Sequence, residues 1–268
     1  MIVVLYPFFY DVYLTFFDYS LLGFGETKFV GFNNYLSLFS DPTYANAWYV
    51  SLVWTIGSLI FQLIIGVPLA FLVNQKLRGR SIVRSFLILP WILPPVVTAI
   101  LWKVILYSPH WGIFNYFLSL FGVPQIIWLG DTSTAMGSII AVNVWYGFPL
   151  IMIIVLAGLQ SIPASLYDAS KVDGASALQT LRYVTLPSLR VFIGIIVLLR
   201  FIWIFQFFDI PWLMTQGGPI YTTMVLPALT YLDAFSMFRL SIGATIALTM
   251  ALFLFLWIFV YIRYVQKR

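Results

Sequence analysis

The chain has 268 residues, of which 62% are hydrophobic and 9% are charged, and its formal net charge is +5. A soluble globular domain is about 45–50% apolar and about 25% charged, so this chain cannot cover a compact fold with a polar surface. Disorder is excluded by the same composition, and the long apolar runs predict an all-α membrane protein rather than a barrel of alternating strands.

In chain order, the first apolar stretch covers residues 1–17, is short and contains Asp11. It lacks the basic region and the cleavage site of a signal peptide, so we expect a first spanning helix that has lost its start. Five longer stretches follow, at 47–73, 86–107, 135–159, 191–213 and 242–264. Each can cross a hydrocarbon layer of about 30 Å at about 1.5 Å per residue. The sequence therefore predicts one membrane domain, residues 1–268, with six transmembrane helices.

Loop charge predicts the orientation of these helices, because short cytoplasmic loops are enriched in Lys and Arg. With the N-terminus inside, the inner segments are 74–85, 160–190 and the C-terminal tail, and segments 18–46 and 108–134 lie outside. The inner segments then hold ten of the 14 basic residues: Lys76, Arg78, Arg80, Arg84, Lys171, Arg182, Arg190, Arg263, Lys267 and Arg268. Both termini are therefore predicted to be cytoplasmic.

Prolines mark two departures from straight spanning helices. Residues 222–240 are apolar but contain Pro227, Asp233 and Arg239, and a full span here would move the basic tail outside, so we expect a re-entrant or outer-interface helix. The run 89–95 contains three prolines, and it is predicted to kink the third span because proline removes helix hydrogen bonds.

Several chemistries have no residues to support them. The sequence contains no Gly-Lys pair and hence no GxxxxGK[ST] phosphate loop, so we expect no ATP site of that kind in this chain. Cysteine is absent, which excludes disulfides and thiolate metal sites. The only histidine, His110, is predicted to be a loop residue. The nine acidic residues are scattered, and acid–base catalysis needs titratable groups close together. We predict no enzyme, no metal site and no bound cofactor.

The inner segment 160–190 reads as helix, turn, helix. Ser161 and Pro163 suit the start of a first helix, and Gly174 can take a positive φ that ends it. A second helix is expected to end before Pro187. Small side chains around the turn allow close approach by another protein, so the hairpin is predicted to be a docking element.

At this hairpin the sequence resembles the membrane-spanning permease subunits of bacterial ATP-binding-cassette (ABC) importers. Their signature is Glu-Ala-Ala, three residues, Gly, nine residues, Ile, one residue and Leu-Pro. This chain has the same spacing, with Asp168, Ser170 and Val184 replacing Glu, the second Ala and Ile. The predicted coupling residues are Asp168, Ala169, Ser170, Asp173, Gly174, Ala175, Val184, Leu186 and Pro187. Residues 31–42 and 207–219, the latter ending in Gly217-Gly218-Pro219, resemble the carbohydrate-uptake members of the family.

The resemblance implies the type I ABC importer permease fold, with 160–190 as a coupling loop that inserts into a groove on an ATPase subunit. It implies a complex with two ATPases, a second permease that is a different chain and an extracytoplasmic solute-binding protein, in a bacterial inner membrane. ATP and Mg²⁺ would be bound by the ATPases, whose closure would switch the permeases from inward- to outward-facing. The implied substrate is a sugar or polyol, and a glycerol-phosphate compound stays an alternative.

Polar groups inside spans usually face the interior of the bundle, because they are costly in lipid. Besides Gln62, the candidates for the substrate pathway are Asn143, Arg200, Trp203, Gln206 and Asp209. Steps of three residues from Trp203 to Gln206 to Asp209 would put all three on one helical face. A ring, an amide and a carboxylate together suit a sugar. Packing roles for Trp203 and Asn143 stay open.

Arg200 lies too deep in its span for easy snorkelling. We expect it to meet Asp11, a backbone carbonyl or an acid on the second permease.

Two other classes of function stay open. A stand-alone secondary transporter driven by ions would need acids deep in the bundle, and the only candidates are Asp11 and Asp209. A membrane scaffold or receptor subunit would explain the docking hairpin but not the buried Arg200.

Overall fold

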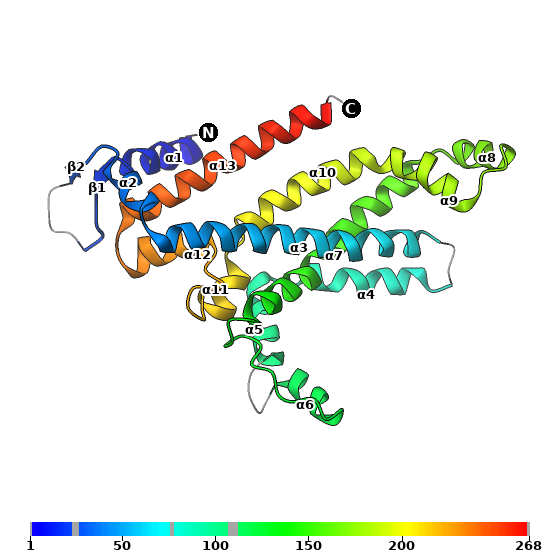
Figure 1. The fold of residues 1–268 in the computed structure, drawn as a ribbon. Helices are drawn as coiled ribbons and strands as arrows, with labels where there is room; N and C mark the ends of the chain where they lie inside the picture. Colours follow the sequence, from blue (N-terminus) through cyan, green and yellow to red (C-terminus); the bar gives the residue numbers. More distant parts are fainter. Residues whose placement is uncertain (1, 23–26, 76–77, 107–111, 267–268) are drawn as a thin grey trace.

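The computed structural model describes residues 2–22, 27–75, 78–106 and 112–266. Five residues with a part in the sequence arguments lie outside this part of the chain: Lys76, Tyr107, His110, Lys267 and Arg268. Within it, four helical stretches are long and apolar enough to cross a membrane: Pro42–Asn74, Ala135–Ser161, Ala177–Thr215 and Leu240–Arg263. They contain α3 (Pro42–Asn74), α7 (Ala135–Ser161), α10 (Leu186–Phe205) and α13 (Leu240–Gln266), which form the body of the molecule (Figure 1). The predicted spans at 47–73, 135–159 and 242–264 are thus confirmed as long apolar helices, and the one at 191–213 lies in an apolar helical stretch that is interrupted after Phe205.

The predicted span at 86–107 is broken in two. Helix α4 (Arg80–Ile92) and helix α5 (Pro95–Ile105) meet at an angle of 96°. Leu93 and Pro94 between them have extended ψ values of 138° and 139°, and Pro95 begins α5, where its missing N–H leaves no bond unmade. The proline run therefore turns the chain sharply instead of kinking one helix. The pair is a fifth candidate span only when its two helices are taken together.

The N-terminal segment folds against the last long helix. Helix α1 (Ile2–Leu14) packs on α13, and β1 (Phe17–Asp18) pairs with β2 (Lys28–Phe29) before α2 (Asn33–Phe39) (Figure 1). Buried Asn34 fastens this segment, because its Nδ2 donates to the carbonyls of Thr15 and Phe17. The 13 residues of α1 reach about 20 Å at about 1.5 Å per residue, short of a full crossing, so the count of six spans stays a prediction.

The core forms where α3 crosses α7 and α10. Gly66 on α3 lies so close to Ile151 and to the Phe148 carbonyl that a Cβ would fall within 2.9 Å of both, so glycine is needed for this approach. Trp54 of α3 is fully buried and donates its Nε1–H to the carbonyl of Ile204 on α10. Three helices are thereby locked through both close packing and hydrogen bonding.

The apolar segment 222–240 does not form a long helix. It contains α12 (Leu226–Tyr231) and a π-helical turn, η2 (Leu232–Ser236), which pack against α13. Helices of six and five residues are too short to cross a bilayer. The expectation that this segment is no full span is therefore met.

Candidate functional site

The 160–190 hairpin forms as two short helices around a glycine turn. Helix α8 (Ala164–Val172) is followed by Gly174, whose φ is +73°, as predicted from its place in the sequence. Helix α9 (Ala177–Thr180) begins with a capping box in which Ser176 and Gln179 satisfy each other's backbone N–H groups. The turn and the start of the second helix are therefore both encoded locally.

Two details of the hairpin differ from the prediction. Ser161 is the last residue of α7, where its Oγ donates back to the Gly158 carbonyl, and Pro163 holds the N-cap position of α8. The second helix does not end before Pro187, because a π-turn, η1 (Leu181–Thr185), leads directly into α10, with Pro187 in the first turn of that helix. The N–H that Pro187 lacks falls at this π-turn, where the Leu186 N–H bonds five residues back to Leu181, and the chain continues as a helix past the proline.

The signature residues are divided between the surface and the interior of the hairpin. Asp168, Ala169, Asp173, Gly174, Leu186 and Pro187 are exposed, and Ala175 and Val184 are half-buried. Ser170 is buried: its Oγ donates to the Tyr167 carbonyl and lies 3.3 Å from Thr180 Oγ1. Ser170 therefore lies between the two helices of the hairpin and contacts both.

The exposed face of the hairpin also carries apolar side chains that the sequence argument missed. Val172 is 88% exposed, Leu178 73% and Tyr183 69%. Asp168, in the same hairpin, is paired with Lys171 at 3.1 Å, and both side chains are largely exposed. Large apolar groups on a polar loop were a visible signal for a protein contact. This face has the mixed composition of a protein-docking surface.

Arg200 forms a buried polar cluster with groups from three helices. It is 5% exposed, and its Nε and Nη2 both donate to Gln62 Oε1 of α3, at 2.9 and 2.7 Å. Gln62 Nε2 in turn donates to the backbone carbonyl of Asn143 on α7, at 2.8 Å. Within this chain Arg200 donates to a neutral amide and not to Asp11 or a backbone carbonyl, so these two expectations are wrong, while an acid on a second permease stays a prediction.

Gly147 and Asn143 define the α7 side of this cluster. A Cβ on Gly147 would overlap Arg200 Nη2 and the Gln62 amide, so only glycine leaves room for the pair. The Asn143 side chain is buried, and its Nδ2 has no hydrogen-bond partner among the described residues. The hydrogen bonds between Arg200 and Gln62 therefore tie helices together. From the sequence, this role was expected only for Asn143.

Trp203, Gln206 and Asp209 do not share one helical face. Helix α10 ends at Phe205, with Gln206 as its C-cap, and α11 (Asp209–Thr215) starts a new helix. Pro211 lies in the first turn of α11, where a backbone N–H has no helical hydrogen bond to make. In the predicted continuous helix, this position would have needed a backbone N–H to bond the preceding turn. Trp203 is 42% exposed and Asp209 is half-buried. The predicted stripe on one continuous helix is therefore wrong, and the pathway role of Trp203, Gln206 and Asp209 stays a prediction.

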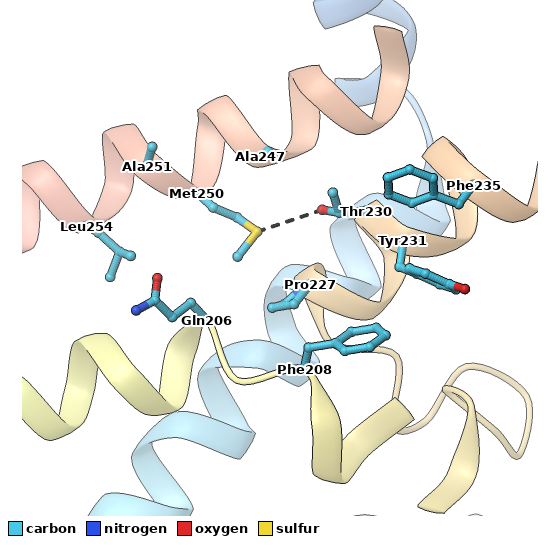
Figure 2. A pocket seen from close by; sticks show the side chains of 10 residues that line it. All are labelled: Gln206, Phe208, Pro227, Thr230, Tyr231, Phe235, Ala247, Met250, Ala251 and Leu254. Carbon is cyan, nitrogen blue, oxygen red and sulfur yellow. Dashed lines mark hydrogen bonds between the residues drawn. The ribbon is translucent and has the colours of Figure 1, made fainter. Parts of the chain in front are cut away.

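Gln206 lines a cavity of about 450 Å³ where the end of α10 faces α12, η2 and α13. Its lining comprises Gln206, Phe208, Pro227, Thr230, Tyr231, Phe235, Ala247, Met250, Ala251 and Leu254. Figure 2 shows the Gln206 side chain extending toward Met250 and Leu254 of α13, with the rings of Phe208, Tyr231 and Phe235 on the other side. The Phe208 and Tyr231 rings lie 5.2 Å apart, and those of Tyr231 and Phe235 5.5 Å.

This cavity has the chemistry of a site for a polyhydroxylated ligand. Aromatic rings offer flat apolar faces, while the Gln206 amide can both donate to and accept from hydroxyl groups. Thr230 Oγ1 donates to the Leu226 carbonyl at 2.9 Å and lies 3.9 Å from the Met250 sulfur, so its lone pairs remain available. The volume lies in the range of small-molecule sites.

A loop beside the cavity is held by hydroxyl groups. Thr215 Oγ1 lies 2.7 Å from Thr223 Oγ1, across a loop in which Gln216 and Gly217 have φ values of 51° and 82°. A Cβ on Gly217 would overlap the Met224 side chain, so the glycine is needed for both its backbone and its space. The Gly-Gly-Pro stretch is therefore a structured turn.

The carboxyl of Asp233 in η2 is buried. It is paired with Arg239. Burial raises the pKa of Asp233, and the hydrogen bond and charge of Arg239 act in the opposite direction. Among the described residues, no group of three or more His, Cys, Asp or Glu side chains could hold a metal ion.

Comparison with known proteins identifies the family of this arrangement. The profile of a family described as "binding-protein-dependent transport system inner membrane component" matches residues 62–268. The trehalose/maltose transport system permease protein MalF of Thermococcus litoralis is 31% identical over 238 residues, which cover 89% of this chain and 80% of that protein.

Two solved structures share the fold. A chain of a bacterial ABC transporter involved in the import of the acidic polysaccharide alginate superposes with a TM-score of 0.86 at 22% identity, covering 99% of this chain and 91% of that one. A chain of a bacterial alginate ABC transporter, in complex with an alginate pentasaccharide-bound periplasmic protein, gives a TM-score of 0.79 at 24% identity, over 86% and 81% of the two chains. At such identities the likeness establishes the fold.

Proposed function

Because the chain belongs to the family of binding-protein-dependent transport system inner membrane components, and is thus a membrane-spanning permease subunit of an ABC importer, we propose that it carries a sugar or a related polyol into the cytoplasm. The observation that carries the choice of substrate is the cavity lined by Gln206, Thr230 and three aromatic rings. The names of the trehalose/maltose relative and of the alginate importers support the same class. Nothing in these relatives supports an ion-coupled transporter that works alone.

Transport is driven by partner subunits in this proposal. The 160–190 hairpin is the coupling loop, and its exposed Val172, Leu178 and Tyr183 enter a groove on an ATPase subunit, with Asp168 at the rim. Two ATPases bind ATP and Mg²⁺, and this chain catalyses nothing itself. Buried Ser170 keeps the hairpin rigid, so that movement of the ATPase is passed on to α7 and α10.

The remaining partners and the topology follow from the same reasoning. A second, different permease completes the pathway, and an extracytoplasmic binding protein delivers the sugar, as supported by the alginate importer with its sugar-loaded periplasmic protein. Six spans with both termini in the cytoplasm keep the basic loops inside a bacterial inner membrane. The α4–α5 pair supplies the third span, and α1 is the described part of the first.

Uptake by the assembled importer tests this function. The chain is purified with its co-expressed ATPase and second permease, reconstituted in liposomes with internal ATP, and supplied with binding protein loaded with a labelled sugar. We expect uptake in the wild type and a strong reduction in Gln206→Ala, because the amide that contacts the sugar is lost.

The matched control is Gln125→Ala, which removes an exposed amide far from the cavity in sequence. We expect it to transport like the wild type. Equal uptake by Gln206→Ala and Gln125→Ala, at equal yield of the complex, would show that the cavity is not on the sugar's path. Absence of any ATP-dependent uptake of sugars or polyols would refute the proposed substrate class.

A further inference from the structure

Residues 112–130 form an arm that stands apart from the helical bundle. The arm consists of α6 (Ile113–Leu120) and the chain that returns to α7, and Figure 1 shows α6 beyond α5, away from α3, α7 and α10. Because the arm leads into the first residue of α7 and the 160–190 hairpin follows its last, the two lie at opposite ends of that helix. The arm is therefore remote from the coupling surface.

The arm has a defined structure of its own. Asn115 is buried: its Nδ2 donates to the Ile126 carbonyl at 2.9 Å, and its Oδ1 accepts from the Ile126 N–H at 3.2 Å and from Trp128 Nε1 at 3.0 Å. The rings of Phe114 and Trp128 meet edge to face with their centres 5.9 Å apart. These contacts tie α6 to the returning chain, so the outward side chains of α6 are presented on a fixed scaffold.

Those outward side chains are apolar. Tyr116, Phe117 and Leu120 are all more than half exposed, and Phe121 is 82% exposed. No Asp, Glu, Lys or Arg occurs from Val104 to Gly130, and the first charge after the arm is Asp131. An arm in water would expose an apolar patch that soluble surfaces rarely tolerate.

We propose that this arm lies at the headgroup interface of the outer leaflet, beside the helical bundle, with its apolar side chains in contact with lipid. Helix α5, which precedes the arm, also exposes apolar side chains, among them Ile100 and Val104. Interfacial helices lie with their apolar side about 5–10 Å into the boundary between headgroups and acyl chains. Tyr116 and Trp128 supply rings of the kind that gather at headgroup level.

The sharp bend between α4 and α5 explains how the chain reaches this place. The 96° turn directs α5 away from the direction of α4 and toward the arm. Lys103 Nζ of α5 donates to the Leu213 carbonyl at 3.0 Å, near the end of α11. The lipid-held arm is thereby joined to the helix that leads into the Gly217-Gly218-Pro219 turn. The choice of the outer leaflet depends on the orientation of the spans given under the proposed function. The contact of the arm with lipid does not depend on that orientation.

Nitroxide labels test the position of the arm, because the chain contains no cysteine. Phe117→Cys and Leu120→Cys place a label on the outward face of α6, and Thr132→Cys places the control label on an exposed residue just past the arm. The labelled importer is studied in nanodiscs of phosphatidylethanolamine and phosphatidylglycerol. We expect labels at 117 and 120 to collide readily with oxygen and poorly with a water-soluble nickel chelate, and the label at 132 to behave in the opposite way.

Three results would overturn the proposal or its choice of leaflet. Nickel collisions at 117 and 120 as frequent as at 132 would place the arm in water. Exclusion of both reagents in the assembled importer, but not in the isolated chain, would show that a partner subunit covers the arm. A membrane-impermeant maleimide should label Thr132→Cys from outside the cell; labelling only from the cytoplasmic side would overturn the leaflet. None of these readouts depends on sugar uptake, so failure of the proposed substrate would leave them unchanged.

Discussion

Replacing Gln62 by leucine isolates the role of the buried polar cluster. Leucine keeps a side chain of similar size at a fully buried position of α3, but it removes the oxygen that accepts from Arg200 Nε and Nη2. The same change removes the donor to the Asn143 carbonyl. Three hydrogen bonds that join α3 to α10 and α7 are lost together, and a buried cation loses its acceptor.

The expected loss of stability is about 3 kcal/mol. Interhelical hydrogen bonds in membrane proteins contribute about 0.6 kcal/mol on average and about 1.7 at most, while bonds to charged groups in soluble proteins contribute about 1.5–3 kcal/mol. Three bonds of about 1 kcal/mol each, between the membrane average and maximum, or two charged bonds of about 1.5 kcal/mol each, both lead to about 3 kcal/mol. It corresponds to a change of roughly a hundredfold in the unfolding equilibrium.

Reversible unfolding in mixed micelles, titrated with a denaturing detergent, measures this free energy. Asn143→Leu is the matched control: its Nδ2 has no partner among the described residues, so the change should cost little. The double variant Gln62→Leu with Arg200→Leu should recover most of the loss, because the unpaired charge is gone as well. A Gln62→Leu variant no less stable than Asn143→Leu would refute the assigned pairing.

Three further predictions concern the hairpin and the outer segment. Gly174→Ala should weaken retention of the ATPase in a pull-down while membrane insertion is unchanged. The left-handed φ of +73° costs a residue with a Cβ about 1–2 kcal/mol, and the effect is one of backbone conformation because no atom lies near that Cβ. Retention equal to that of the wild type would contradict this. Asp168→Ala should leave folding unaltered, since its exposed pair with Lys171 contributes about 0.2–0.5 kcal/mol, but it should raise the ATP hydrolysed per sugar imported; an equal ratio would make the carboxylate dispensable. Burial raises the pKa of Asp233 in the folded chain despite Arg239, so the stability that this group contributes is present at low pH and is lost as pH rises through the folded pKa. Asp233→Asn should therefore flatten the pH dependence of the thermal unfolding temperature. An unchanged pH dependence would contradict the raised pKa.

Local features of the sequence were sufficient for the membrane class, the long helices and the hairpin. Apolar runs of about 20 residues predict spanning helices whatever they pack against. Gly174 and the Ser176–Gln179 box act within one turn of chain, and the proline run 89–95 breaks a helix by its own chemistry. The spacing from Asp168 to Pro187 could be compared with a family before any fold was known.

The candidate pathway could be predicted only in part, because it depends on which residues meet across the bundle. The spacing of Trp203, Gln206 and Asp209 implied a shared face only if the helix were continuous, and the break at Gln206 removed that condition. The same break directs Gln206 toward side chains of α13 such as Leu254, almost 50 positions later in the chain.

The partner of Arg200 shows the same limit. A buried cation on α10 demands an acceptor, and the sequence predicts that demand, but carboxylates, carbonyls and amides all satisfy it. The choice of Gln62, 138 positions away, follows from the close approach of α3, α7 and α10, for which Gly147 leaves the space. The sequence by itself determined the membrane-spanning helices, the hairpin and the family, because these depend on neighbours along the chain. Only the tertiary structure decided the polar cluster and the Gln206 cavity, because their members are brought together by packing between distant helices.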